Sequence, residues 1–120
     1  MSRIDYRNIE KDTLKNKMYR DVLYTVPKKF QLVLMSLDVG EDIPEEVHGG
    51  HVQFIRVESG TGIAIVGRKK YKLFDGISIT IPPGKKHYIK NTSKTEMLKL
   101  YSIYAPDEHP PRRKNKRQPK

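Results

Sequence analysis

In residues 76–91 the chain reads GISITIPPGKKHYIKN, and this stretch carries most of the information about the fold. Isoleucine alternates with serine and threonine over residues 77–81, which is the pattern of a strand with one buried face. Pro82 and Gly84 then mark a turn. His87 follows the turn with a side chain that can bind a metal or carry a proton. The stretch therefore predicts a strand, a tight turn and a candidate site residue, in that order.

A second stretch, residues 40–60, reads GEDIPEEVHGGHVQFIRVESG and holds three more side chains of metal-ligand type. Glu46 and His48 are two positions apart, so on an extended segment they project to the same side. Gln53 opens the next predicted strand and shares its inward face with two apolar residues. We expect these three side chains to converge with His87 on one site.

The rest of the chain repeats the β pattern at intervals of about eight to twelve residues, with turn residues between the strands and little helix. This spacing predicts an all-β sandwich or barrel. A short helix from Thr13 to Met18, capped by Asp12, is expected in the N-terminal region. Strands are expected at residues 20–25, 30–38, 52–58, 63–66, 71–74, 77–81 and 96–104.

The spacings in the two stretches resemble the two motifs of the cupin superfamily. Residues 76–91 match the whole second motif, whereas residues 40–60 match the first motif in spacing but not in chemistry. Where the family usually has His-x-His and a later Glu, this chain has Glu46-x-His48 and Gln53. The resemblance implies an all-β fold with a single jelly-roll β-barrel, as in small RmlC-like cupins. The predicted domains are an N-terminal arm with a first strand (1–29), the barrel (30–109) and a basic tail (110–120).

The candidate ligands Glu46, His48, Gln53 and His87 predict one divalent metal ion in the barrel mouth. Imidazole nitrogens together with carboxylate or amide oxygens suit Zn, Mn, Fe, Ni or Cu, and the ligands alone do not select among them. The alternative is that these positions keep the spacing for the turns, with Glu46 and Gln53 only forming hydrogen bonds in a barrel that holds no metal.

Three further side chains are candidates for contact with a substrate. His51 lies three residues after His48, and a histidine titrates near neutral pH. It is therefore a surface imidazole, a reserve metal ligand, or an acid or base beside the metal. Tyr104 falls on the inward face of the last predicted strand, near the barrel mouth. Arg56 lies on the strand that begins near Gln53. For each of the three, the alternative is an ordinary packed or solvated residue.

Charge is distributed unevenly along the chain. The net charge is +10, but the last ten residues hold six cations and no acid, which leaves +4 for residues 1–110. A terminal run of this kind predicts a disordered tail. The tail is expected to be a solvated end, a localisation signal or a weak contact for nucleic acid or another anionic partner. No cysteine, membrane span or signal peptide appears, so we expect a cytoplasmic protein.

The resemblance leaves three functions open. The first is a metal-dependent isomerase or lyase acting on a small molecule, such as a sugar or sugar acid. The second is a metal-dependent dioxygenase, which would favour iron. The third is a non-catalytic ligand-binding module whose basic tail contacts an anionic partner. Because edge strands need protection, we also expect a homodimer that buries Leu23 and Tyr24.

Overall fold

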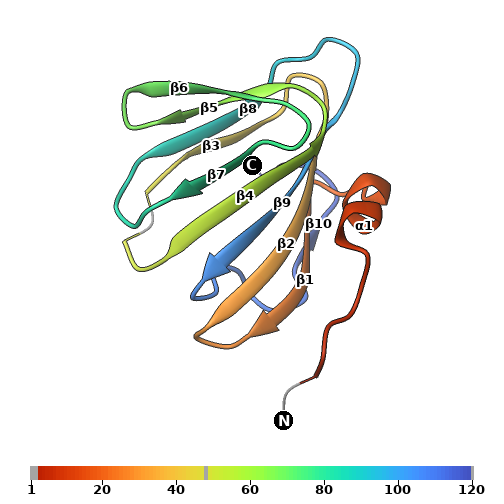
Figure 1. The fold of residues 1–120 in the computed structure, drawn as a ribbon, viewed down its shortest axis with the longest axis vertical. Helices are drawn as coiled ribbons and strands as arrows, with labels where there is room; N and C mark the ends of the chain where they lie inside the picture. The colour runs from red at the N-terminus through yellow and green to blue at the C-terminus, as the bar shows by residue number, and fades with distance from the viewer. Residues whose placement is uncertain (1–2, 48, 120) are drawn as a thin grey trace.

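The computed structural model describes residues 3–47 and 49–119 and consists mostly of β-strands, as predicted (Figure 1). The elements, in chain order, are α1 (Ile9–Lys15), β1 (Arg20–Val26), β2 (Phe30–Leu37), β3 (Asp42–Glu46), β4 (Val52–Ser59), β5 (Gly62–Val66), β6 (Lys69–Leu73), β7 (Ser78–Ile81), β8 (His87–Asn91), β9 (Leu98–Ala105) and β10 (Lys114–Asn115). In the described part of the chain, no helix is long and apolar enough to cross a membrane.

The strands form two antiparallel sheets that face each other, as in a jelly roll (Figure 1). One sheet has the order β10-β1-β2-β9-β4-β7, and the other has the order β3-β8-β5-β6. Both contribute to one apolar core, which includes Met35 and Leu100 from the first sheet and Ala64 and Ile89 from the second. The buried apolar surface between the sheets is the main stabilising term of such a fold.

The alternation predicted for β4 and β9 is confirmed. On β4, Gln53, Ile55 and Val57 are all buried and point inward. On β9, the residues that pair directly with Gln53 and Ile55 are Tyr104 and Ser102, and both are buried. Since side chains opposite each other in an antiparallel pair lie close together, this register brings the Gln53 amide next to the Tyr104 phenol.

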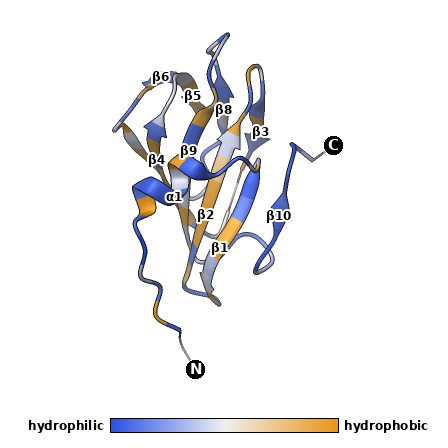
Figure 2. Cartoon of the chain, turned by 90° about the vertical axis from the view of Figure 1, so that its right-hand side faces the viewer, coloured by the Kyte–Doolittle hydropathy of each residue, from blue (hydrophilic) through white to orange (hydrophobic). Residues whose placement is uncertain are grey.

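The N-terminal helix begins earlier than predicted. Asn8 is the N-cap of α1, and its side-chain oxygen accepts a hydrogen bond from the Lys11 amide at 2.9 Å. The expected cap, Asp12, instead lies within the helix and accepts a hydrogen bond from Arg7 at 3.0 Å. The helix packs against β2, β4 and β9 of the six-stranded sheet, on the side seen in Figure 2.

The C-terminal segment, for which composition predicts disorder, makes specific contacts over the residues that the structure describes. β10 pairs with β1 in antiparallel register, and the Tyr19 amide donates a hydrogen bond to the Lys116 carbonyl at 3.2 Å. The Lys114 ammonium lies 2.8 Å from the Asp21 carboxylate. Composition predicted disorder because the tail has no apolar residues to bury. The structure instead gives it backbone hydrogen bonds and acidic partners on distant parts of the chain.

Candidate functional site

The candidate site begins at Gln53, whose side chain is only 2% exposed. Its amide nitrogen donates hydrogen bonds to the Ser102 hydroxyl at 3.2 Å and to the Tyr104 hydroxyl at 3.1 Å. The amide oxygen of Gln53 is also buried, and among the described residues it has no hydrogen-bond partner. A buried polar atom without a partner costs free energy, so this oxygen marks a position where an additional group would bind favourably.

Tyr104 forms one wall of the site. The ring is buried and lies edge-on to two imidazoles, with centroid separations of 5.5 Å to His51 and 5.3 Å to His109. Burial raises the pKa of the Tyr104 phenol well above its usual value, and the negative charge of Glu46 raises it further. Tyr104 is therefore neutral at physiological pH, and the Glu46 carboxylate belongs to the same electrostatic environment.

In the other sheet, Glu46 of β3 pairs with His87 of β8, after a shift in register between Ile43 and Glu46. The Glu46 carboxylate lies 3.9 Å from Nε2 of His87. Nδ1 of His87 lies 3.1 Å from the Lys85 carbonyl oxygen, which can only accept a hydrogen bond. This contact favours the tautomer with the proton on Nδ1. Nε2 is then the atom with a lone pair, and this is the usual arrangement for a metal-binding histidine.

His51 is not a surface imidazole, which was one of the alternatives given for it. Its side chain is 10% exposed, and Nε2 lies 3.1 Å from the Glu108 carboxylate. Glu108 and its neighbour His109 follow the last long strand, and the side chain of Gln31 holds their backbone. The Gln31 amide oxygen accepts hydrogen bonds from the Glu108 and His109 amides at 3.1 and 2.8 Å, and its nitrogen donates to the His109 carbonyl at 2.7 Å.

Sequence reasoning missed Gln31, Ser102, Glu108 and His109 as contributors to this site. Gln31 is 78 positions away from His109, and no local pattern links the two. Ser102 lies two positions before Tyr104 on β9, so it shares the inward face that was predicted for Tyr104. The inward alternation of β9 was the single available signal, and it pointed to Ser102 and Tyr104 but not to the segment after the strand.

One predicted site residue, Arg56, is not brought together with the others. Arg56 alternates with Ile55 and Val57, so it lies on the opposite face of β4. Its guanidinium is 3.6 Å from the Glu58 carboxylate, and the side chain is 43% exposed. His48 lies outside the described residues.

The remaining donors can be tested against the predicted metal. Among residues 3–47 and 49–119, no group of three or more His, Cys, Asp or Glu side chains forms a metal cluster. The pair of Glu46 and His87 supplies one carboxylate and one imidazole, and Gln53 adds a buried amide oxygen. Oxygen and nitrogen donors of these types suit a divalent transition metal. The donor set therefore fits a metal when the Gln53 amide is counted as a ligand.

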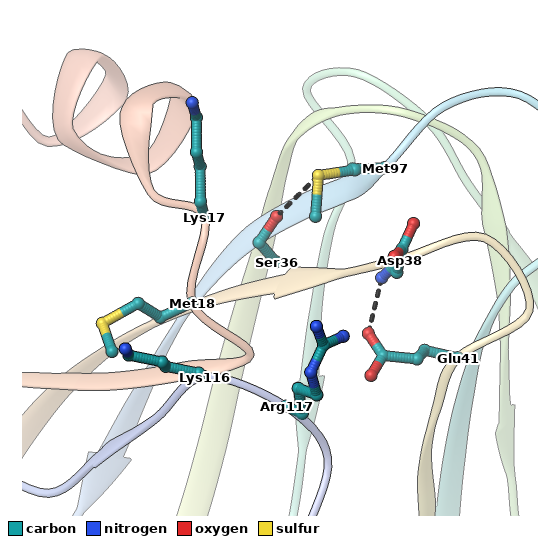
Figure 3. Close-up of a pocket in the computed structure, with 8 residues that line it drawn as sticks. All are labelled: Lys17, Met18, Ser36, Asp38, Glu41, Met97, Lys116 and Arg117. Atoms are coloured by element: carbon teal, nitrogen blue, oxygen red, sulfur yellow. Dashed lines mark hydrogen bonds between the residues drawn. The ribbon is translucent and has the colours of Figure 1, made fainter.

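A separate pocket of about 450 Å³ lies near the base of the tail (Figure 3). Lys116 and Arg117 line it together with Asp38 and Glu41, so its charges are mixed. Asp38 and Glu41 already interact, because the Asp38 amide donates to the Glu41 carboxylate at 2.6 Å. None of the candidate site residues lines this pocket.

Comparisons with known proteins agree with this architecture. The family model for the cupin domain matches residues 33–104. The chain is 50% identical over 107 residues to protein L612 of Acanthamoeba polyphaga mimivirus, covering 87% of this chain and 66% of that protein. It is 45% identical over 109 residues to YrkC of Bacillus subtilis, covering 86% and 58% respectively. The chain thus spans less than two thirds of the length of either relative.

Solved structures show the same fold. The crystal structure of BH2720 from Bacillus halodurans is 40% identical, with a TM-score of 0.92 over 96% of this chain and 90% of that one. TT1209 from Thermus thermophilus is 21% identical, with a TM-score of 0.74 over 86% and 98% of the two chains. The matched region, the two facing sheets and the inward Gln53 and His87 side chains lead to one conclusion, which is that this chain belongs to the cupin family.

Proposed function

We propose that this cupin binds one divalent metal ion through Glu46, Gln53 and His87, together with the predicted ligand His48. The observation that carries the proposal is the Gln53 amide oxygen, which is buried and has no partner among the described residues. A cation at this position would satisfy that oxygen. The Lys85 carbonyl supports the same assignment, because it fixes the His87 tautomer that leaves Nε2 able to bind.

The proposed substrate is a small oxygen-rich molecule of the sugar or sugar-acid class, and the proposed reaction is an isomerisation or elimination. A bound metal would act as a Lewis acid on a carbonyl or hydroxyl oxygen of the substrate. Tyr104 contributes a neutral phenol at the wall of the site because its pKa is raised by burial. His51 and Glu108, which lie 3.1 Å apart beside Tyr104, form a pair able to hold a proton.

Metal analysis tests the proposal directly. Protein purified without a histidine tag should contain about one equivalent of metal, and His87→Ala should lose most of it because one imidazole ligand is removed. Gln53→Leu should weaken metal affinity by about tenfold or more, because it removes one ligand of a coordination shell. Inductively coupled plasma mass spectrometry and titration with Mn, Fe(II), Ni and Zn measure both effects.

His109→Ala is the matched control, since it removes a histidine that contacts Tyr104 but is not a proposed ligand. It should retain the metal. Wild-type protein that takes up none of the four metals would overturn the metal site. Bound iron together with consumption of dioxygen would favour the dioxygenase over the isomerase or lyase.

A further inference from the structure

A wide groove lies between β6 and β7. It adjoins the candidate site, because Val66 in its lining pairs with His87 across β5 and β8, but none of the candidate site residues lines it. β6 is the last strand of the four-stranded sheet, and β7 is the last strand of the six-stranded sheet. The two strands lie on the same side of the barrel in Figure 1 and line one hollow of about 900 Å³. No ladder in the described part of the chain joins β6 to β7, so each strand presents an open edge.

The floor of this groove is apolar. Val66, Ile77 and Ile79 line it, and all three are partly exposed residues that pack against the main core. Pro82 lines it as well. The hydrophobic core is therefore incompletely covered along this groove. Covering these side chains would be favourable by the same hydrophobic effect that holds the two sheets together.

The rim of the groove is strongly basic. Five cations line it, and none of the lining residues is acidic. The five are Arg68, Lys69, Lys70, Lys72 and Lys85. All of them are exposed, and three lie on β6, where the burial pattern shows water contact along most of the strand. The groove therefore combines an apolar floor, a cationic rim and two strand edges with unpaired backbone groups.

We propose that this groove binds an extended, acidic segment of a partner protein, in which apolar side chains alternate with Asp or Glu. The apolar side chains would lie on the floor, the carboxylates would contact the lysines of the rim, and the backbone would pair with an open strand edge. A second copy of the chain fits less well, because lysines on an edge strand repel the same lysines on another copy. Nucleic acid would leave the apolar floor without a matching surface.

A fluorescein-labelled eight-residue peptide of alternating Glu and Val is the probe. We expect saturable binding by fluorescence anisotropy to the full chain. The charge-reversed variant K70E/K72E should bind about tenfold or more weakly, since it turns two attractive contacts into repulsive ones. A peptide of alternating Glu and Ser should bind about fivefold more weakly to the wild type, because it has nothing to place on the floor.

The control variant is K29E/K94E, which makes the same change in net charge at two exposed lysines outside the groove. It should bind the probe within about twofold of the wild type if contacts are local. Equal loss in both variants, or no binding of the probe by the wild type, would overturn the proposal.

Two further results would also overturn it. One is tighter binding of a single-stranded oligonucleotide than of the Glu-Val peptide, with the same sensitivity to K70E/K72E. The other is a homodimer whose mass in light scattering falls to that of the monomer in K70E/K72E, which would assign the groove to a second copy. Metal content should be unchanged in both variants, so the result of the peptide-binding test does not depend on whether the proposed metal site is correct.

Discussion

Two buried glutamines show how one residue type serves structure in one place and the candidate site in another. Gln31 is 0% exposed, and both ends of its amide are bonded to the Glu108 and His109 backbone and to Thr25. Gln53 is similarly buried, but its amide oxygen has no partner in the described part of the chain. We interpret Gln31 as the residue that positions the segment with Glu108 beside His51.

Replacing Gln31 tests this positioning role. Gln31→Leu keeps the volume roughly constant but leaves the Glu108 and His109 amides without their acceptor. We expect the free energy of unfolding to fall by about 2–4 kcal/mol, since three partly buried backbone groups of Glu108 and His109 lose their partners and the buried Gln31 amide is removed. Urea denaturation followed by circular dichroism measures the change.

Gln118→Leu is the matched control, because Gln118 is partly exposed and bonds to acidic side chains at the surface. It should cost less than about 1 kcal/mol. A loss as small as this for Gln31→Leu would show that the segment with Glu108 is held by other contacts.

At the residue scale, the sequence predicted the features that depend on the spacing of residues close together in the chain. Alternation placed Gln53 and Tyr104 on inward faces, and the turn before His87 set that residue at the start of a strand. The contacts of Glu108 with His51 and of Gln31 with His109 join residues far apart in the chain. Such contacts depend on how the sheets pack, which no local pattern records.

The turn between β4 and β5 holds a glycine that has a positive φ and also lies against main-chain atoms. Gly60 has φ +105°, and a Cβ atom there would lie 2.4 Å from the Met97 carbonyl oxygen. Gly84 also has a positive φ of +82°, but a Cβ atom there would meet nothing within 4 Å. Comparing an alanine at Gly60 with an alanine at Gly84 therefore separates the cost of steric overlap from the cost of the positive φ.

We expect Gly60→Ala to lower the free energy of unfolding by about 3 kcal/mol, because backbone strain and a clash with fixed main-chain atoms act together. Gly84→Ala should cost about 1 kcal/mol, from the positive φ alone. Thermal and urea unfolding of both variants measure the difference. Equal losses would show that the Met97 carbonyl moves aside without cost.

The C-terminal strand can be tested by two truncations. A chain ending at His109 loses β10, the Lys114 contact with Asp21 and the Asn115 contact with Arg20. It should keep its fold, with the free energy of unfolding lowered by about 1–2 kcal/mol. A chain ending at Lys116 retains β10 and should be nearly as stable as the full chain. Identical free energies of unfolding for the full chain and both truncated chains would support the disordered tail that composition predicts.

At the element scale, the alternating strands could be predicted because each buries one face against the core. β10 could not be predicted, since a two-residue strand of Lys114 and Asn115 has no apolar period to detect. The helix was expected four residues too late because Asp12 and Asn8 are both good capping residues. Only the backbone geometry decides between them.

At the scale of the whole molecule, buried tyrosines make stability depend on alkaline pH. Burial raises the pKa of Tyr19 and Tyr104 well above the usual value near 10. Above about pH 10 the unfolded chain loses these protons while the folded chain keeps them. The unfolded state then binds fewer protons, so the free energy of unfolding should decrease as the pH rises, by up to about 1.4 kcal/mol per pH unit for each tyrosine.

Urea unfolding at several pH values between about 8 and 11 measures how steeply the free energy of unfolding decreases with pH. Tyr104→Phe should make this decrease shallower. Tyr71→Phe removes a tyrosine hydroxyl at an exposed position and is the matched control. Burial lowers the pKa of Lys99, so Lys99 changes the free energy of unfolding with pH in the opposite direction. Both variants keep Lys99, so the difference between them reports the contribution of Tyr104 alone. A slope unaffected by Tyr104→Phe would mean that water reaches this phenol in the folded state.

The placement of β10 also bears on how copies of this protein can aggregate. In the six-stranded sheet, β10 pairs with Arg20 and Asp21 of β1 at one end, while β7 is the edge strand at the other end. Another copy cannot pair with the positions of β1 that β10 occupies, so growth of the sheet is hindered at this end. The homodimer expected from the sequence stays a prediction, but growth of this sheet into a filament is disfavoured. By this reasoning the basic C-terminal segment acts as a partial chain terminator in the sense of polymer chemistry, and removing it would open the start of β1 to pairing with another copy.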